Sequence, residues 1–160
     1  VERAKKIKLL LMDCDGVLTD GKLYFSENGE TLKVFHVRDG QGIVSWHKAG
    51  FISGIISGRN SKIVERRANE LAIKFIRQGS NNKLLDFEEI LEEISLTPEE
   101  VAYIGDDIPD IPLLKAVGLS ATVADAADEV FSQVHFITKK EGGHGAIREL
   151  CDFLLKSKAM

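Results

Sequence analysis

The sequence predicts an α/β fold, in which helices cover both faces of a parallel sheet. Short apolar runs alternate along the chain with longer segments whose apolar residues recur at helical spacing. One segment breaks this alternation, because an Asn-Gly pair there lies between residues of alternating polarity. No repeat or low-complexity linker divides the 160 residues. We therefore expect residues 1–160 to form a single domain, a three-layer Rossmann-like parallel sheet with a projecting β-hairpin and no cap domain.

Six short apolar runs are predicted to be strands. In the first, Ile7–Met12, every residue except Lys8 is apolar, as expected for a strand covered on both faces. The predicted strands are Ile7–Met12, Ile52–Ile56, Ile73–Ile76, Val101–Ile104, Leu119–Val123 and His135–Ile137.

Helices are predicted between these strands. The clearest is Lys83–Ile94, where Leu84, Phe87 and Leu91 recur on one helical face. A capping box at Thr97–Glu100 predicts a further short turn of helix. The predicted helices are Gly42–Ala49, Ser61–Leu71, Lys83–Ile94, Asp110–Ala116, Ala126–Phe131 and Ala146–Lys156.

The interrupting segment predicts a β-hairpin over about residues 22–37, with Asn28-Gly29 at its turn. An isolated hairpin is marginally stable in water. We therefore expect it to pack on its own domain or on another subunit.

The composition narrows the class of protein. The net charge of −4 and the pI near 5.6 argue against a nucleic-acid surface. Two separated cysteines suit a reducing compartment, and no apolar run reaches the length of a membrane span. We expect a cytoplasmic protein with no nucleic-acid or membrane partner.

Polar side chains follow several predicted strands where each strand ends. In an open parallel sheet, ligands bind beyond the carboxyl ends of the strands. Asp13 and Asp15 follow the first strand, separated only by Cys14, which we expect in the core. The same edge is predicted to receive Ser57, Gly58, Arg59, Lys83, Asp106, Asp107 and Asp110.

This set of carboxylates favours a hard cation. Two carboxylates about 4 Å apart repel by about 4 kcal/mol at an effective dielectric constant of about 20. Because every candidate ligand is an oxygen, Mg²⁺ fits best, with Mn²⁺ and Co²⁺ left open.

Phosphoryl transfer is the chemistry that this set suits. Asp13 is placed as the nucleophile, and Asp15 as the acid that protonates the leaving alcohol and then the base that activates water. Neighbouring carboxylates are expected to favour the protonated form of Asp15 that this role needs. Ser57, the amides of its loop and Lys83 can bind the phosphoryl oxygens.

Four ordered motifs carry a resemblance to a known superfamily. "DCDGVLTDG", "IISGR", the lysine of "NNK" and "GDDIPD" resemble the haloacid dehalogenase-like phosphatases over nearly the whole chain. The resemblance implies that Asp13, the backbone carbonyl of Asp15, and Asp106 bind Mg²⁺. It also implies a supporting role for Asp107 or Asp110.

Further segments narrow the resemblance. "FHVRDGQGI", "GDDIPDIPLL" and "GGHGAIRE" resemble the 3-deoxy-D-manno-octulosonate 8-phosphate (KDO 8-P) phosphatase family, and also the phosphatase-like domain attached to some acylneuraminate cytidylyltransferases. This implies a sugar phosphate substrate and a homotetramer. Where that family commonly has asparagine and arginine, this chain has His36 and His144. The implied substrate-binding residues are His36, Val37, Arg38, Asp39, Gly40, Gly58, Arg59, Arg67 and His144, together with Asp15 and Lys83.

The intervals between the motifs are too short for a separate lid. An open site exposes the reaction to bulk water. We therefore expect the hairpin or C-terminal tail of a neighbouring subunit to cover it.

Alternative functions share parts of this pattern. One is a phosphatase of a related nine-carbon keto-acid phosphate. Others are a receiver-like phospho-switch and a catalytically silent oligomerisation domain. A receiver would carry its phosphorylated aspartate on the third strand, whereas here that strand leads into "RQGSNNK". A glycosyltransferase also uses a DxD motif, but no nucleotide-binding region is evident.

Overall fold

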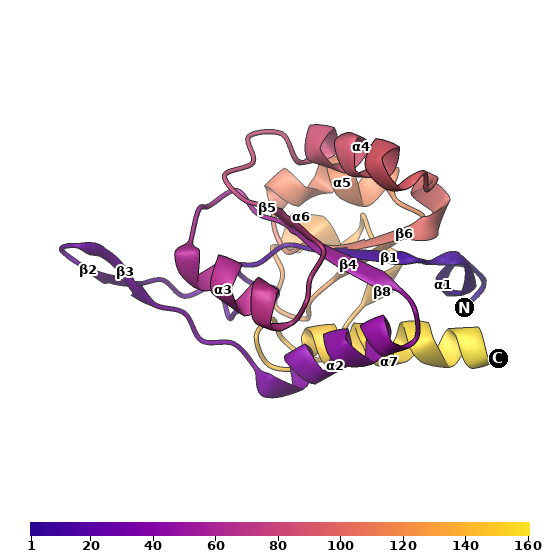
Figure 1. The fold of residues 1–160 in the computed structure, drawn as a ribbon, viewed down its shortest axis with the longest axis horizontal. Coiled ribbons are helices and arrows are strands. Elements are labelled where there is room, and N and C mark those ends of the chain that lie inside the picture. Colours follow the sequence, from indigo (N-terminus) through magenta and orange to yellow (C-terminus); the bar gives the residue numbers. More distant parts are fainter.

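The computed structural model describes residues 1–160 and contains a six-stranded sheet between two layers of helices (Figure 1). All strands of this sheet are parallel, in the order β5-β4-β1-β6-β7-β8. The predicted fold class is confirmed. The strands are β1 (Leu9–Met12), β4 (Ile52–Ile56), β5 (Phe75–Arg77), β6 (Val101–Ile104), β7 (Leu119–Thr122) and β8 (Phe136–Ile137).

The helices cover the two faces of the sheet. The core on one face is formed with α1, α2, α3 and α7, and the core on the other with α4, α5 and α6. Strand β1 serves both, because Leu10 and Met12 face one core while Leu9 and Leu11 face the other. No helix has the length and apolar character needed to cross a bilayer. The helices are α1 (Glu2–Lys6), α2 (Val37–Lys48), α3 (Lys62–Glu70), α4 (Lys83–Ile94), α5 (Ile111–Ala116), α6 (Asp128–Phe131) and α7 (Ala146–Ala159), with 3₁₀ turns at Pro98–Glu100 and Ile108–Asp110.

The predicted hairpin is present and projects away from the sheet (Figure 1). It consists of β2 (Tyr24–Ser26) and β3 (Gly29–Leu32), and Gly29 adopts a positive φ of 108° at the turn. The two strands together span only residues 24–32, whereas the hairpin was predicted over about residues 22–37. The hairpin and its flanks expose the apolar side chains of Leu23, Tyr24, Phe25, Leu32 and Val34.

Helix α2 begins earlier than predicted, at Val37 rather than at Gly42. The His36 ring caps it, because Nδ1 accepts a hydrogen bond from the amide of Arg38. Asp39 is buried, and its Oδ1 accepts a 2.9 Å hydrogen bond from the amide of Arg148 in the first turn of α7. The first turn of α2 is thus fixed by a contact with a distant helix.

The other elements lie close to their predicted bounds. The span of α4 matches its prediction, and the capping box is confirmed by a 3.0 Å hydrogen bond from the Thr97 amide to Glu100. Strand β5 begins two residues later than predicted, since Ala72 turns the chain with a φ of 59°. Helix α1 was not predicted.

Candidate active site

An open cleft of about 290 Å³ lies at the carboxyl ends of the central strands. None of the residues that line it has a large hydrophobic side chain. The loops after β1, β4 and β6 and the start of α4 supply most of them. The cleft is lined by Asp13, Asp15, Gly21, Ser57, Gly58, Arg59, Lys83, Asp106, Asp107, Pro109 and Asp110.

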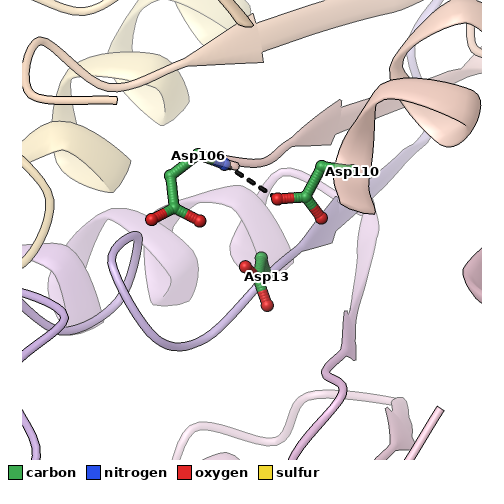
Figure 2. Close-up of side chains that lie close together, drawn as sticks. All are labelled: Asp13, Asp106 and Asp110. Atoms are coloured by element: carbon green, nitrogen blue, oxygen red, sulfur yellow. Dashed lines mark hydrogen bonds between the residues drawn. The ribbon is translucent and has the colours of Figure 1, made fainter. Parts of the chain in front are cut away.

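Three carboxylates converge in this cleft. Figure 2 shows Asp13 facing Asp106 and Asp110, and one oxygen of each lies within 4.8 Å of the others. Asp13 follows β1, and Asp106 follows β6, the strand that pairs with β1. The convergence follows from sheet topology, because adjacent parallel strands end at the same edge.

Asp110 organises the loop that follows β6. Its Oδ2 accepts hydrogen bonds of 2.9 Å from the Asp106 amide, drawn in Figure 2, and 3.1 Å from the Asp107 amide. Its Oδ1 accepts a 2.5 Å hydrogen bond from the hydroxyl of Tyr103 in β6. Asp107 instead caps the following 3₁₀ turn through the amide of Ile108, and its side chain is not among the three converging carboxylates.

Lys83, the first residue of α4, is the cation of this cluster. Its Nζ lies 2.6 Å from Asp110 Oδ1, 3.2 Å from Asp13 Oδ1 and 3.2 Å from the Tyr103 hydroxyl. Helix α4 holds this position because Asn82 caps it by accepting from the Leu85 amide.

The electrostatics reflect an excess of negative charge. Burial, and then the Asp110 carboxylate, raise the pKa of Asp13 to about 6. Burial, and then Asp13, raise the pKa of Asp106 to about 8. Burial would lower the pKa of Lys83, but Asp13 and Asp110 outweigh it and raise the pKa.

This donor set fits a hard divalent cation. Three carboxylates gather close together, and the nearby Lys83 ammonium supplies a single positive charge. Burial and the neighbouring carboxylates raise the pKa values of Asp13 and Asp106, so a bound cation would favour their ionised forms. Oxygen ligands of this kind suit Mg²⁺.

Asp15 has neighbours different from those expected. Its Oδ1 accepts a 2.6 Å hydrogen bond from Lys33, which follows β3 of the hairpin, and its Oδ2 lies 3.8 Å from Nε of Arg59. The charged groups in direct contact with its carboxylate are therefore cations, and one further carboxylate, that of Glu30, lies 3.1 Å from the same Lys33 ammonium. Burial would lower the pKa of Lys33, but hydrogen bonds to Asp15 and Glu30 outweigh it and raise the pKa.

The loop after β4 supplies another part of the cleft wall. Ser57 is buried, and its hydroxyl accepts a 3.4 Å hydrogen bond from the Arg59 amide. Gly58 is exposed, so its backbone is open to the cleft. Arg59 is exposed as well, and its guanidinium lies 5.6 Å from the ring centroid of Phe25 in the hairpin.

Several predicted substrate-binding residues do not line this cleft. Arg67, His36, Asp39 and Gly40 border a separate small cavity between α2 and α3. Asp39 is buried there, and an added Cβ at Gly40 would come within 2.5 Å of the Arg67 guanidinium. Three predicted residues line neither the cleft nor this small cavity, and all three are exposed: Val37, Arg38 and His144.

Two residues of the site, Lys33 and Tyr103, were not among the predicted ones. Tyr103 lies in β6, within an apolar run that predicted only a strand. Lys33 lies in the hairpin segment, where a lysine is ordinarily solvent-exposed. No local signal distinguishes either residue, because the contacts of Lys33 with Asp15 and of Tyr103 with Asp110 form only when the chain folds.

Comparison with known proteins shows which families this chain is similar to. A model of the haloacid dehalogenase-like hydrolase family matches residues 55–150. A 3-deoxy-D-manno-octulosonate 8-phosphate phosphatase, KdsC of Escherichia coli (strain K12), is 46% identical over 155 residues, which cover 97% of this chain and 82% of that protein.

Solved structures agree with this relationship. The crystal structure of the 3-deoxy-D-manno-octulosonate 8-phosphate phosphatase from Yersinia pestis matches with a TM-score of 0.97 and 44% identity, covering 99% of this chain and 85% of that one. The enzyme of the same description from Moraxella catarrhalis, in complex with magnesium ion, phosphate ion and KDO, matches with a TM-score of 0.96 and 38% identity, covering 99% and 91%.

Proposed function

The chain belongs to the haloacid dehalogenase-like hydrolases and, among them, to the 3-deoxy-D-manno-octulosonate 8-phosphate phosphatase family, and on that premise we propose that it hydrolyses KDO 8-phosphate to KDO and phosphate with Mg²⁺. The observation that carries this proposal is the convergence of Asp13, Asp106 and Asp110 with Lys83 at one edge of the sheet. The Moraxella catarrhalis relative has magnesium, phosphate and KDO bound, which supports the same ligands here.

The residues suggest a two-step reaction through an aspartyl phosphate. A carboxylate oxygen of Asp13 attacks phosphorus, forming an O–P bond while the bond to the sugar oxygen breaks. Asp15 gives its proton to that departing oxygen. Lys83 and the amides of the Ser57 loop hold the equatorial phosphoryl oxygens, where charge accumulates in the transition state.

The second step returns Asp13 to its starting state. Asp15, now ionised, removes a proton from a water molecule, which attacks the phosphorus of the aspartyl phosphate. The O–P bond to Asp13 breaks and inorganic phosphate leaves. One residue thus serves as acid and then as base.

Magnesium would be held by the carboxylates of Asp13 and Asp106 and the backbone carbonyl of Asp15, with Asp110 fixing the Asp106 loop through its amides. When bound, it supplies positive charge that permits a phosphate dianion to approach these carboxylates.

We also propose that the protein acts as a homotetramer in the cytoplasm. The apolar side chains on the projecting hairpin suit burial against another subunit. Such an assembly would let a neighbour's hairpin or C-terminal tail cover the open cleft. It would also allow residues outside the cleft, such as Arg38 and His144, to meet substrate bound to another chain.

A phosphate-release assay tests the function. With Mg²⁺, we expect kcat/KM for KDO 8-phosphate to exceed that for a nine-carbon keto-acid 9-phosphate, and Asp13→Asn to abolish both. Preference for the nine-carbon ester would replace the substrate assignment. Stable phosphorylation of one residue per chain, without turnover, would indicate a phospho-switch instead.

A further inference from the structure

The base of the hairpin carries a buried lysine that contacts the site. The side chain of Lys33 is only 3% exposed, although it directly follows a strand that projects from the domain. Its ammonium lies 2.6 Å from Asp15 Oδ1 and 3.1 Å from Glu30 Oε1. A lysine at this depth is seldom found without a specific partner.

Glu30 and Lys33 form an ion pair within the hairpin segment. They are three residues apart, and the Glu30 side chain is itself 20% exposed. Lys33 therefore reaches Asp15 with its ammonium already placed between two carboxylates. Such support by neighbouring residues is what holds a reacting group within the narrow geometric limits of catalysis.

Arg59, in the loop after β4, approaches the other oxygen of Asp15 and also lies near the hairpin. The Arg59 guanidinium lies 3.8 Å from Asp15 Oδ2 and 5.6 Å from the Phe25 ring centroid. Oδ1 makes the short hydrogen bond to Lys33, whereas Oδ2 has no hydrogen-bond partner in the chain. Oδ2 is thus the carboxylate oxygen left free to meet a bound substrate.

We propose that Lys33 is a positioning residue for the acid/base Asp15, holding Oδ1 so that Oδ2 faces the departing oxygen of the substrate. The hairpin then serves the catalytic site of its own chain. This inference rests on the proposed phosphatase function. It does not depend on which phosphate ester is the natural substrate.

The leaving-group dependence of the rate tests this role. Phenyl phosphate and 4-nitrophenyl phosphate have similar shapes, but phenolate is the stronger base and needs protonation more. We expect Lys33→Met to lower kcat/KM for phenyl phosphate by about 10²-fold, the usual contribution of a general acid. For 4-nitrophenyl phosphate the loss should be several-fold at most, and Lys33→Arg should recover most of the phenyl phosphate activity.

Two further variants sharpen the comparison. Glu30→Gln should also lower the ratio of kcat/KM for phenyl phosphate to kcat/KM for 4-nitrophenyl phosphate. The factor should be smaller than for Lys33→Met, because this change weakens the hold on Lys33 without removing the lysine. Lys22→Met is the matched control, since Lys22 is exposed at the start of the hairpin segment and its side chain makes no ion pair. Its ratio should equal that of the unmodified protein. Melting temperature and oligomeric state are measured for every variant.

The outcomes separate this inference from the proposed function. Equal losses on both aryl phosphates would show that Lys33 is merely structural, and a loss confined to KDO 8-phosphate would make it a substrate contact; either result overturns the inference. If Lys33→Met does not fold, an unchanged ratio in Glu30→Gln overturns it. An unmodified protein that hydrolyses aryl phosphates but not KDO 8-phosphate would refute the substrate assignment alone.

Discussion

The hydroxyl of Tyr103 donates a 2.5 Å hydrogen bond to Oδ1 of Asp110, and both side chains are buried. Tyr103→Phe should therefore lower the free energy of unfolding by about 1.5–3 kcal/mol, the range for hydrogen bonds to charged groups. Urea denaturation measures this change. Tyr24→Phe, on the exposed hairpin, should stay within about 0.5 kcal/mol. Equal effects in the two variants would contradict the assigned hydrogen bond.

Asp13→Asn should reduce phosphate release by about 10³-fold or more, because an amide cannot serve as the nucleophile. The same change should raise the melting temperature of the magnesium-free protein at pH 8, since it removes one of three crowded carboxylates. Asp128→Asn, in the exposed first turn of α6, should change neither quantity. Retained turnover in Asp13→Asn would refute the proposed nucleophile.

The stability of the magnesium-free protein should fall as the pH rises from 5 to 8.5. Burial, followed by neighbouring carboxylates, raises the pKa of Asp13 to about 6 and that of Asp106 to about 8, both above the value of 3.8 in the unfolded chain. The folded state therefore binds more protons than the unfolded state in this range, and unfolding becomes easier as they dissociate.

Magnesium should reverse this trend. At about 100 times its dissociation constant it should add about 2.7 kcal/mol, and it should stabilise more at pH 8 than at pH 5 because protons compete with it for the carboxylates. Thermal unfolding with EDTA or with Mg²⁺ measures both effects. A magnesium-free protein whose stability rises between pH 5 and 8.5 would contradict the assignment.

Lys83→Met should lower kcat by about 10²–10³-fold, as removal of one preorganised electrostatic donor usually does. The variant also leaves Asp110 without its 2.6 Å partner, so its stability must be measured beside its activity. Lys62→Met, at the exposed start of α3, is the control. Unchanged kcat in a folded Lys83→Met protein would remove Lys83 from the mechanism.

The double variant Leu23→Asp and Val34→Asp should weaken self-association, because it places charge among the exposed apolar side chains of the hairpin segment. Light scattering over a range of concentrations measures the assembly. Glu27→Gln at the hairpin turn should leave it unchanged. A monomeric unmodified protein with full activity would contradict the proposed tetramer.

Local sequence signals predicted much of the fold. Helix α4 has a capping asparagine and a clear apolar face, and its predicted bounds match the structure. The start of α2 was misplaced, because Arg38-Asp39-Gly40 suggests a turn in isolation. In the folded chain Asp39 instead bonds to the amide of Arg148, 109 residues away, and only tertiary structure provides that contact.

The gathering of Asp13, Asp106 and Lys83 could be predicted because parallel strands deliver their last residues to one edge. The environment of Asp15 could not, since it depends on a lysine that the hairpin turns back toward the sheet. The role of Tyr103 could not be predicted for a similar reason. Its position in an apolar strand predicts that it is buried, but does not predict its hydrogen bond to Asp110.

The sheet order also bears on how the protein emerges during synthesis. In the sheet, β1 lies between β4 and β6, which are the second and fourth of the six strands to be translated. Asp106, after β6, comes 93 residues after Asp13. A nascent chain on the ribosome therefore holds β1 with one side unpaired until β6 leaves the exit tunnel. Because Asp106 and Asp110 both follow β6, the acidic triad cannot assemble before β6 has left the tunnel.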